Sequence, residues 1–163
     1  MFAIRALVDS ERPALRQFWI THWGADYVVA RGRLIKPDIL QAFVAVDEGE
    51  WLGLVTFCFE TPFCEIVSLD SLRPGCGIGT TLMKMARQKA LESGCHTLRL
   101  ITTNDNTHAL RFYQKLGFEL TALYCHAVDL SRKLKPSIPE TGQDGIPIRD
   151  EIELQLRLSS STP

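Results

Sequence analysis

An alternating glycine run at residues 75–79 is the stretch whose residue types most directly suggest chemistry. It follows an apolar segment that ends at Leu69 and precedes a run of residues with helical periodicity. Glycine permits positive φ and has no Cβ, so several backbone N–H groups can converge on one anion. The first turn of a helix adds N–H groups without partners and the positive end of the helix dipole. The pattern predicts a diphosphate site, although a ligand-free turn between strand and helix would produce the same spacing.

Residues that the glycine run lacks reduce the number of candidate ligands for this turn. A phosphate loop of the P-loop type requires Gly-Lys-Ser/Thr, which does not follow here. A dinucleotide site requires Gly-x-Gly-x-x-Gly at the opening of repeated strand–helix units, whereas this run reads Gly-x-Gly-x-Gly in mid-chain. The spacing therefore disfavours NAD without excluding it. A nicotinamide-dependent oxidoreductase stays as an interpretation that depends on the glycines alone.

A second motif lies downstream, where residues 106–118 read Asn-Thr-His-Ala-Leu-Arg-Phe-Tyr-Gln-Lys-Leu-Gly-Phe. Together with the glycine run, it resembles the GNAT superfamily of acyl-CoA-dependent N-acetyltransferases, whose helix carries the pattern Asn-x-x-Ala-x-x-Phe-Tyr-x-x-x-Gly-Phe. The resemblance covers residues 63–120 and extends loosely to the opening strand and helix. It implies a mixed α/β fold with a mostly antiparallel central sheet, flanking helices, and a splayed parallel pair of strands at 63–69 and 97–103.

The resemblance also implies that acetyl-CoA is the acyl donor. The strand backbone at Leu69 would pair with the pantetheine arm and polarise the acyl carbonyl. Asn106, which its residue type makes a helix cap, would contact the coenzyme near the same arm. The family usually has Arg or Gln before the first glycine, whereas this sequence has Pro74 there and Arg73 one residue earlier. The diphosphate would bind the backbone of Gly75, Cys76, Gly77, Ile78, Gly79 and Thr80.

Direct acyl transfer from a thioester to an amine requires a base for the amine proton and an acid for the departing thiolate. The resemblance places Tyr113 where many GNAT enzymes protonate the sulfur, although spacing alone makes it part of an apolar helix face. It places Glu65 in a strand where several relatives carry a catalytic carboxylate. Period-two alternation predicts that Glu65 shares a strand face with Val67 and Leu69. A structural carboxylate at Glu65, Asp70 as the base, and a reaction without a dedicated base stay open.

The resemblance also implies where the amine acceptor binds. In the GNAT fold, the first helix and the loop after it commonly line the acceptor pocket. Arginines there suit an acceptor that bears a carboxylate or a phosphate, and they suit solvated loop positions equally well. A histidine on an aromatic helix face is more often packed and hydrogen-bonded than catalytic. The candidate acceptor-binding residues are His22, Trp23, Tyr27, Arg31 and Arg33.

The elements that must position these residues follow from periodicity and from chain breakers. Three helices are predicted, from the start signal at 9–13 to Gly24, from Ile78 to near Gly94, and from Ala109 to Gly117. The second helix would bury Ile78, Leu82, Met85, Ala86 and Ala90. Strands are expected at 2–8, 42–46, 51–59, 63–69, 97–103 and 118–130, with a loop at 136–148 and no assignment for 25–40.

The last segment of regular pattern, residues 151–158, alternates strictly between apolar and other residues. This predicts a strand with one face buried and the other in contact with water. Such a strand could also be a sheet edge that pairs between subunits. Both a monomer and a homodimer therefore stay open.

Length, charge and cysteine usage limit the class of protein. A chain of 163 residues suits one domain spanning 1–163. Its 18 basic and 19 acidic residues leave a net charge of −1, so no basic excess indicates a nucleic-acid or membrane partner. Five scattered cysteines without a Cys-x-x-Cys pair disfavour a disulfide framework and a zinc site, and no metal is expected. No apolar stretch approaches membrane-spanning length, so a cytoplasmic location is predicted.

These observations predict an N-acetyltransferase that moves the acetyl group of acetyl-CoA to a primary amine by direct transfer within a ternary complex. The alternative is a non-catalytic acyl-CoA-binding or sensor module that retained the loop without acceptor chemistry. The acceptor itself stays open among amino acids, polyamines, antibiotics, peptide N-termini and protein lysines.

Overall fold

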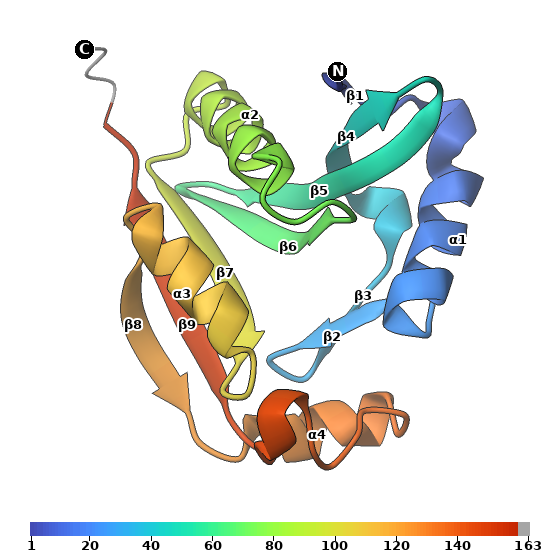
Figure 1. The fold of residues 1–163 in the computed structure, drawn as a ribbon. Coiled ribbons are helices and arrows are strands. Elements are labelled where there is room, and N and C mark those ends of the chain that lie inside the picture. Colours follow the sequence, from blue (N-terminus) through green and yellow to red (C-terminus); the bar gives the residue numbers. More distant parts are fainter. Residues whose placement is uncertain (160–163) are drawn as a thin grey trace. The chain divides into compact units, whose positions relative to one another are not determined.

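Four antiparallel strands lie side by side in the order β1, β4, β5, β6 (Figure 1). They span Ala3–Ala6 (β1), Gln41–Asp47 (β4), Glu50–Glu60 (β5) and Phe63–Ser71 (β6). The turn between β4 and β5 has positive φ at Glu48 and Gly49, as the sequence around residues 47–50 predicts for a hairpin.

Helix α2 (Ile78–Glu92) packs on β4, β5 and β6. It ends at Ser93 and Gly94, where the sequence predicts its end. Its buried face is formed by Ile78, Leu82, Met83, Ala86 and Ala90. The expected Met85 is instead 36% exposed, because the helical phase turns Met83 toward the sheet.

The structure, a computed structural model, describes residues 1–159, which divide into two compact units. One unit holds residues 1–15, 37–98 and 157–159, and it contains the β4–β6 strands and α2. The other holds residues 16–36 and 99–156. The single domain expected from chain length stays a prediction.

The second unit contains three sheet strands, in which β9 (Glu151–Arg157) lies between β7 (Thr97–Thr103) and β8 (Glu119–Tyr124). β8 and β9 are antiparallel. The last strand is therefore interior, and the expectation that it forms a sheet edge is wrong: β8 is the outer strand of this trio.

This unit also contains two helices that follow β7 in the chain and a small two-stranded hairpin. Helix α3 (Thr107–Lys115) follows β7, and the strand after α3 is shorter than predicted. The strand expected over 118–130 stops at Tyr124, and helix α4 (Ala127–Leu134) follows. The unassigned segment 25–40 contains a small hairpin formed by β2 (Val28–Ala30) and β3 (Arg33–Ile35).

Helix α1 (Arg12–Trp23) begins after a 3₁₀ turn at Asp9–Glu11 and stops at Gly24, which has φ 74°. A second 3₁₀ turn covers Pro37–Ile39, and a third, at Gln143–Gly145, lies within the segment predicted as a loop. The chain therefore has the expected mixed α/β fold with flanking helices. The splay expected between residues 63–69 and 97–103 stays a prediction.

The face of β9 predicted to contact water is in fact covered. Glu151 and Glu153 are only 2% and 7% exposed, although they alternate with apolar residues. Their carboxylates are not isolated, because Ser131 donates to Glu151 and Tyr124 donates to Glu153. Burial of these carboxylates is tolerated because they are hydrogen-bonded.

The start of β9 is tied to the end of β7 through Asn104 and Asp150. Asn104 Oδ1 accepts from the N–H of Asp150 at 2.9 Å, and the N–H of Asn104 donates to the carbonyl of Asp150. The Asp150 carboxylate accepts from the Arg149 side chain and from the N–H of His126. These two interactions, the Arg149 hydrogen bond above all, lower the pKa of Asp150.

Replacing Asp150 by Asn is expected to weaken the dependence of stability on acid pH. A carboxyl whose pKa is lowered on folding stabilises the protein above its unfolded pKa, and this contribution is lost as pH falls through the folded value. The stabilisation contributed by Asp150 should therefore be complete above pH 3.8, its ordinary pKa, and should be lost as the pH falls below that value. Thermal unfolding against pH should show a shallower decline for Asp150→Asn, whereas the exposed control Asp144→Asn should follow the wild type. Equal slopes for both variants would contradict this role.

Candidate functional site

The glycine turn before α2 has the backbone that an anion site requires. Gly75 and Gly77 have φ of 79° and 76°, which only glycine adopts without strain. The first helical hydrogen bond runs from Thr81 N–H to Gly77 O at 3.0 Å. The N–H groups of the three residues between them, 78–80, therefore point out of the helix end, and no side chain caps the helix at Gly77.

The open side of this turn faces solvent, since residues 71–77 are all exposed. Adding a Cβ at Gly75 or Gly77 would meet no atom within 4 Å. The two glycines are thus needed for their backbone angles, and the space above them is empty of side chains. The turn combines outward N–H groups with the positive end of the α2 dipole, which suits a phosphate group.

A close backbone approach fixes the turn on the sheet. A Cβ at Gly53 of β5 would clash with the carbonyl oxygen of Asp70 and would lie 3.0 Å from Ile78 Cγ2. The N–H of Leu72 donates to Leu52 O at 2.8 Å beside this contact. Gly53 therefore lets the end of β6 and the start of α2 sit directly on β5. Gly53 was not among the predicted site residues, and its only signal in the sequence is a glycine inside a strand pattern.

Arg73, next to the departure at Pro74, takes part in an exposed ion pair. Its guanidinium lies 3.6 Å from a carboxylate oxygen of Asp47, with side-chain exposures of 55% and 23%. The N-terminal amino group of Met1 shares the same carboxylate at 3.3 Å. Exposed pairs of this kind contribute about 0–1 kcal/mol, so Arg73 is not strongly held away from the turn.

Glu65 lies on the opposite face of β6 from the one predicted. In the ladder with β5, Thr56 pairs with Ser68 and Phe57 pairs with Ile66, which leaves Val67 as an extra residue. Such a bulge reverses the alternation of side chains beyond it. The prediction that Glu65, Val67 and Leu69 share one face is therefore wrong.

The bulge places Glu65 on the face of Cys58, its direct partner in the ladder. Thr56 and Ser68 lie on this face too, with their hydroxyl oxygens 2.8 Å apart. Leu69, which pairs with Val55, lies on the other face.

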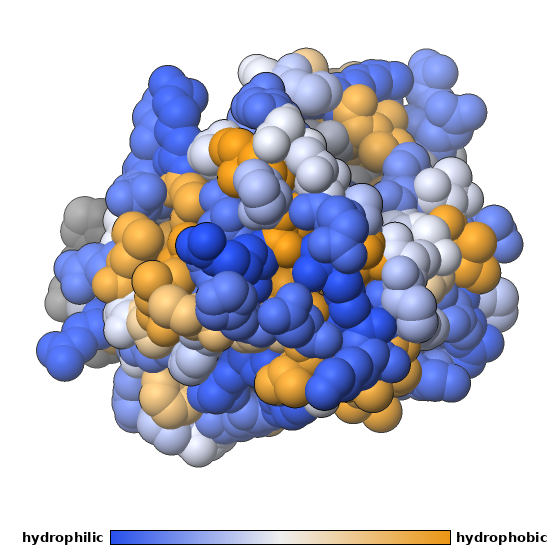
Figure 2. Space-filling view, turned by 90° about the horizontal axis from the view of Figure 1, so that it is seen from below, coloured by the Kyte–Doolittle hydropathy of each residue, from blue (hydrophilic) through white to orange (hydrophobic). Residues whose placement is uncertain are grey.

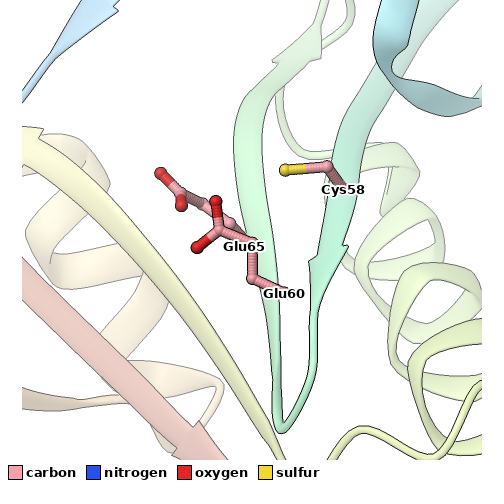
Figure 3. Close-up of side chains that lie close together, drawn as sticks. All are labelled: Cys58, Glu60 and Glu65. Carbon is pink, nitrogen blue, oxygen red and sulfur yellow. The ribbon is translucent and has the colours of Figure 1, made fainter. Parts of the chain in front are cut away.

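Glu65, Glu60 and Cys58 form a cluster in which the potential ligand atoms all lie within 4.8 Å of one another. Figure 3 shows the three side chains on neighbouring strands, with the two carboxyl groups close together. Glu65 is 3% exposed, Cys58 is half-buried and Glu60 is exposed. The cluster thus runs from the protein interior to solvent.

The same donor set could hold a metal ion, because thiolate and carboxylate are both zinc ligands. One further ligand or a water would complete ordinary tetrahedral coordination. The expectation that this chain uses no metal stays a prediction.

Asn106 caps helix α3, as predicted: its Oδ1 accepts from the N–H of Ala109 at 3.1 Å. Asn104 and Asp105 also have residue types that favour helix capping, but their side chains bind other parts of the chain. Asn104 accepts from the N–H of Asp150, as described above. Asp105, 6% exposed, accepts from the Thr103 hydroxyl and from the N–H of Gln143. The residues before α3 are therefore held by the end of β7 and by the 143–150 segment.

Tyr113 lies on the buried side of α3 and is 9% exposed. Its ring packs edge-on against Phe112 and Phe118, with centroids 5.3 and 5.6 Å away. The N–H of Phe118 donates to the carbonyl of Tyr113 at 3.1 Å. The aromatic contacts fix the ring plane, so the direction of the phenolic oxygen is set by packing.

The predicted acceptor residues at the end of α1 are partly accessible. His22 is exposed and packs on Phe18 at a centroid distance of 4.3 Å. Trp23 is 38% exposed. Farther along, Arg33 is exposed in the β2–β3 hairpin. These side chains are thus accessible to solvent, and their roles stay predictions.

Lys135 is a buried lysine that was not among the predicted site residues. It is 9% exposed, and its Nζ donates to the carbonyl of Trp23 at 2.8 Å. Burial lowers the pKa of Lys135. The ammonium lies 5.7 Å from the ring centroid of Tyr27, whose hydroxyl donates to Leu134 O at 3.4 Å. The lysine thus stabilises the carboxyl end of α1 and the chain after it.

One face of the molecule mixes hydrophobic and hydrophilic residues. Figure 2 shows one face, on which hydrophobic residues form small groups separated by hydrophilic ones. Scattered apolar residues of this kind are normal on protein surfaces. Within residues 1–159, no helix has the length and apolar character required to cross a bilayer.

Comparison with known proteins adds to this geometry. A family model described as "Acetyltransferase (GNAT) family" matches residues 4–118. The protein YdhI of Bacillus subtilis (strain 168), described as uncharacterized, is 43% identical over 139 residues, which are 85% of this chain and 87% of YdhI. Aminoglycoside N(6')-acetyltransferase type 1 of Salmonella typhimurium (strain LT2) is 26% identical over 129 residues, 72% of this chain and 88% of that enzyme.

Among solved structures, a Bacillus subtilis acetyltransferase in complex with CoA superposes with a TM-score of 0.70. The match covers 98% of this chain and 100% of that one, at 20% sequence identity. A likeness at this identity shows the shared fold.

Replacing Gly53 by Ala is expected to displace the glycine turn from its position on β5. The added methyl group must displace the Asp70 carbonyl or Ile78, and overpacking of this kind costs about 1–3 kcal/mol. We expect a lower unfolding midpoint together with a several-fold weaker affinity for CoA, measured by calorimetric titration. Val44→Ala, a core truncation in β4, is the control that should lower stability and leave CoA affinity unchanged. CoA affinity equal to wild type in Gly53→Ala would contradict the role of this contact.

Proposed function

The chain belongs to the acetyltransferase (GNAT) family, and on that premise we propose that it transfers the acetyl group of acetyl-CoA to a primary amine by direct attack. The observation that carries the proposal is the pair of positive-φ glycines, Gly75 and Gly77, whose turn leaves the N–H groups of α2 open. A turn of this shape suits the diphosphate of a coenzyme A thioester. The CoA found in a structural neighbour of the same fold supports this choice of donor.

The donor would be held along β6 and at the start of α2. Backbone N–H groups of residues 75–80 bind the diphosphate, and Arg73 moves from Asp47 to add a positive charge. The backbone of Leu69 pairs with the pantetheine arm. Asn106 serves the coenzyme indirectly as the α3 cap and directly through contacts near the same arm.

The reaction needs a proton acceptor and a proton donor. Glu65 takes a proton from the acceptor ammonium, and the neutral nitrogen attacks the thioester carbonyl carbon. The nitrogen of the tetrahedral intermediate gives its second proton to water, the C–S bond breaks, and the thiolate takes the phenolic proton of Tyr113. The phenolate is reprotonated from solvent as products leave. A hydroxyl with a pKa near 10 is a suitable donor to an alkyl thiolate.

The cluster around Glu65 supports an amine acceptor. A primary amine is a cation at neutral pH, and the adjoining carboxylates of Glu60 and Glu65 attract it before it loses its proton. Glu60 is exposed and meets the amine first, whereas Glu65 is buried, where proton transfer is shielded from water. A relative that acts on aminoglycosides, which carry several amines, is consistent with this class of acceptor.

The proposal is tested by following thiol release from acetyl-CoA with a panel of primary amines, including polyamines, aminoglycosides and peptides. We expect acetylated product from at least one class, confirmed by a mass gain of one acetyl group. CoA binding without transfer to any amine would contradict the proposal and favour a non-catalytic acyl-CoA sensor.

Tyr113→Phe is expected to lower kcat by about 10–100-fold, because removal of a general acid leaves the thiolate to depart unprotonated. The ring contacts with Phe112 and Phe118 do not involve the hydroxyl and are retained in the variant, so acetyl-CoA affinity should change little. Steady-state kinetics at saturating acetyl-CoA provide the measurement. An unchanged kcat would remove Tyr113 from the mechanism.

Glu65→Gln is expected to reduce kcat/KM for the amine by about 100-fold or more near neutral pH, because the variant cannot accept the proton. The matched variant Glu60→Gln removes the same charge from the exposed member of the cluster. It should raise KM for the amine and leave kcat nearly intact. If both variants behave alike, attraction of the cation rather than proton transfer accounts for Glu65.

A further inference from the structure

The turn of the β2–β3 hairpin contains a non-glycine residue with a left-handed backbone. Arg31 has φ 53° and Gly32 has φ 67°, and Ala30 pairs with Arg33 on either side of them. Two successive positive φ values form the tight turn that suits a two-residue hairpin loop. Asparagine, aspartate and glycine usually occupy the first of these positions, so an arginine there is unusual.

The contacts of Arg31 explain why this residue occupies the turn. Its backbone N–H donates to Glu151 Oε2 at 2.8 Å, and its guanidinium lies 3.6 Å from Glu153 Oε2. The guanidinium carbon also lies 5.6 Å from the ring centroid of Tyr124. One residue at the hairpin tip therefore reaches β8 and β9 through three separate interactions.

The two glutamates are suited to hold the hairpin because they are themselves fixed. Glu151 also accepts from the Ser131 hydroxyl at 2.8 Å, which connects it to α4. Glu153 also accepts from Tyr124, Thr121 and Gln155. Buried carboxylates with several donors cannot easily move, so the hairpin tip is held against a rigid site.

The other end of the same segment is held as well. Lys135 Nζ binds the carbonyl of Trp23, and the Tyr27 hydroxyl binds Leu134 O. The chain between α1 and β3 is thus attached to α4 at its start and to β9 at its tip. A short hairpin of two three-residue strands would be marginal without such attachments.

We propose that Arg31 is a positioning residue, which holds the β2–β3 hairpin against Glu151 and Glu153 so that the acceptor-binding segment is ordered before the amine arrives. The proposal rests on the proposed function, because residues 22–33 were assigned to the acceptor on that basis. In this role the guanidinium of Arg31 pairs with the carboxylate of Glu153 and does not bind a carboxylate or phosphate of the acceptor. An ordered binding segment strengthens binding, since less conformational entropy is lost when the ligand binds.

The test compares Arg31→Met, which removes the charge at similar length, with Arg31→Lys, which retains it. Glu153→Gln removes the charge from the other partner. Arg87→Met, an arginine loss on the exposed face of α2, is the control. Two readouts are needed, amide hydrogen exchange of residues 28–35 and the separate kinetic constants for amine and acetyl-CoA.

Arg31→Met is expected to raise exchange of the hairpin amides and the KM for the amine by about tenfold each, with kcat and the acetyl-CoA KM within about twofold of wild type. Arg31→Lys should recover part of both effects, and Glu153→Gln should reproduce them. The Arg87→Met control should match the wild type. If Arg31→Met proves unstable, the same comparison is made with Arg31→Lys and Glu153→Gln.

Three results would overturn the inference or its premise. Unchanged hairpin exchange in Arg31→Met and Glu153→Gln would show that these contacts do not hold the hairpin. Faster exchange with an unchanged KM for the amine would separate the hairpin from acceptor binding while the proposed function stands. Failure of the wild type to acetylate any amine would overturn the proposed function and the acceptor role together, whereas the exchange data would still decide whether Arg31 holds the hairpin.

Discussion

The glycine turn depends on a close contact between two backbones. β5 has no side chain at Gly53, so the carbonyl of Asp70 and the first residue of α2 can rest directly on the strand. That contact fixes where α2 begins, and Gly77 then closes the turn with its positive φ. The outward N–H groups that follow are a consequence of these two glycines. In a protein that binds a diphosphate, the fit of the anion is thus decided by backbone packing rather than by charged side chains.

The proposed chemistry depends in a similar way on a local irregularity. One extra residue in β6, Val67, turns Glu65 toward Cys58 and Glu60 and separates it from the face of Leu69. The donor and the base then belong to different faces of one strand. Such a separation suits direct transfer, because the thioester arm and the incoming amine must approach the same carbon from different sides. The bulge is therefore as important to the proposed mechanism as the carboxylate itself.

Much of this arrangement could be predicted from the sequence, because glycines and capping residues act over a few neighbouring positions. The α2 start, the Asn106 cap and the hairpin turn at Glu48 and Gly49 were all of this kind. The errors came from interactions that local sequence does not encode. Helix α4 begins directly after His126, which has φ 58°, and no glycine or proline marks this break. Glu151 and Glu153 alternate with apolar residues, a pattern typical of a strand face in contact with water. Both nevertheless contact Arg31, which is more than 100 residues away in the chain.

The central claim, that the backbone at the start of α2 holds a coenzyme diphosphate, is tested most directly by residue-resolved amide NMR. Labelled protein would be titrated with CoA and, separately, with pantetheine, which has the same thiol arm but no diphosphate. We expect CoA to shift the amide signals of residues 77–80 strongly and pantetheine to leave them nearly unchanged. Binding of CoA without any shift of these amides would contradict a diphosphate site at the start of α2.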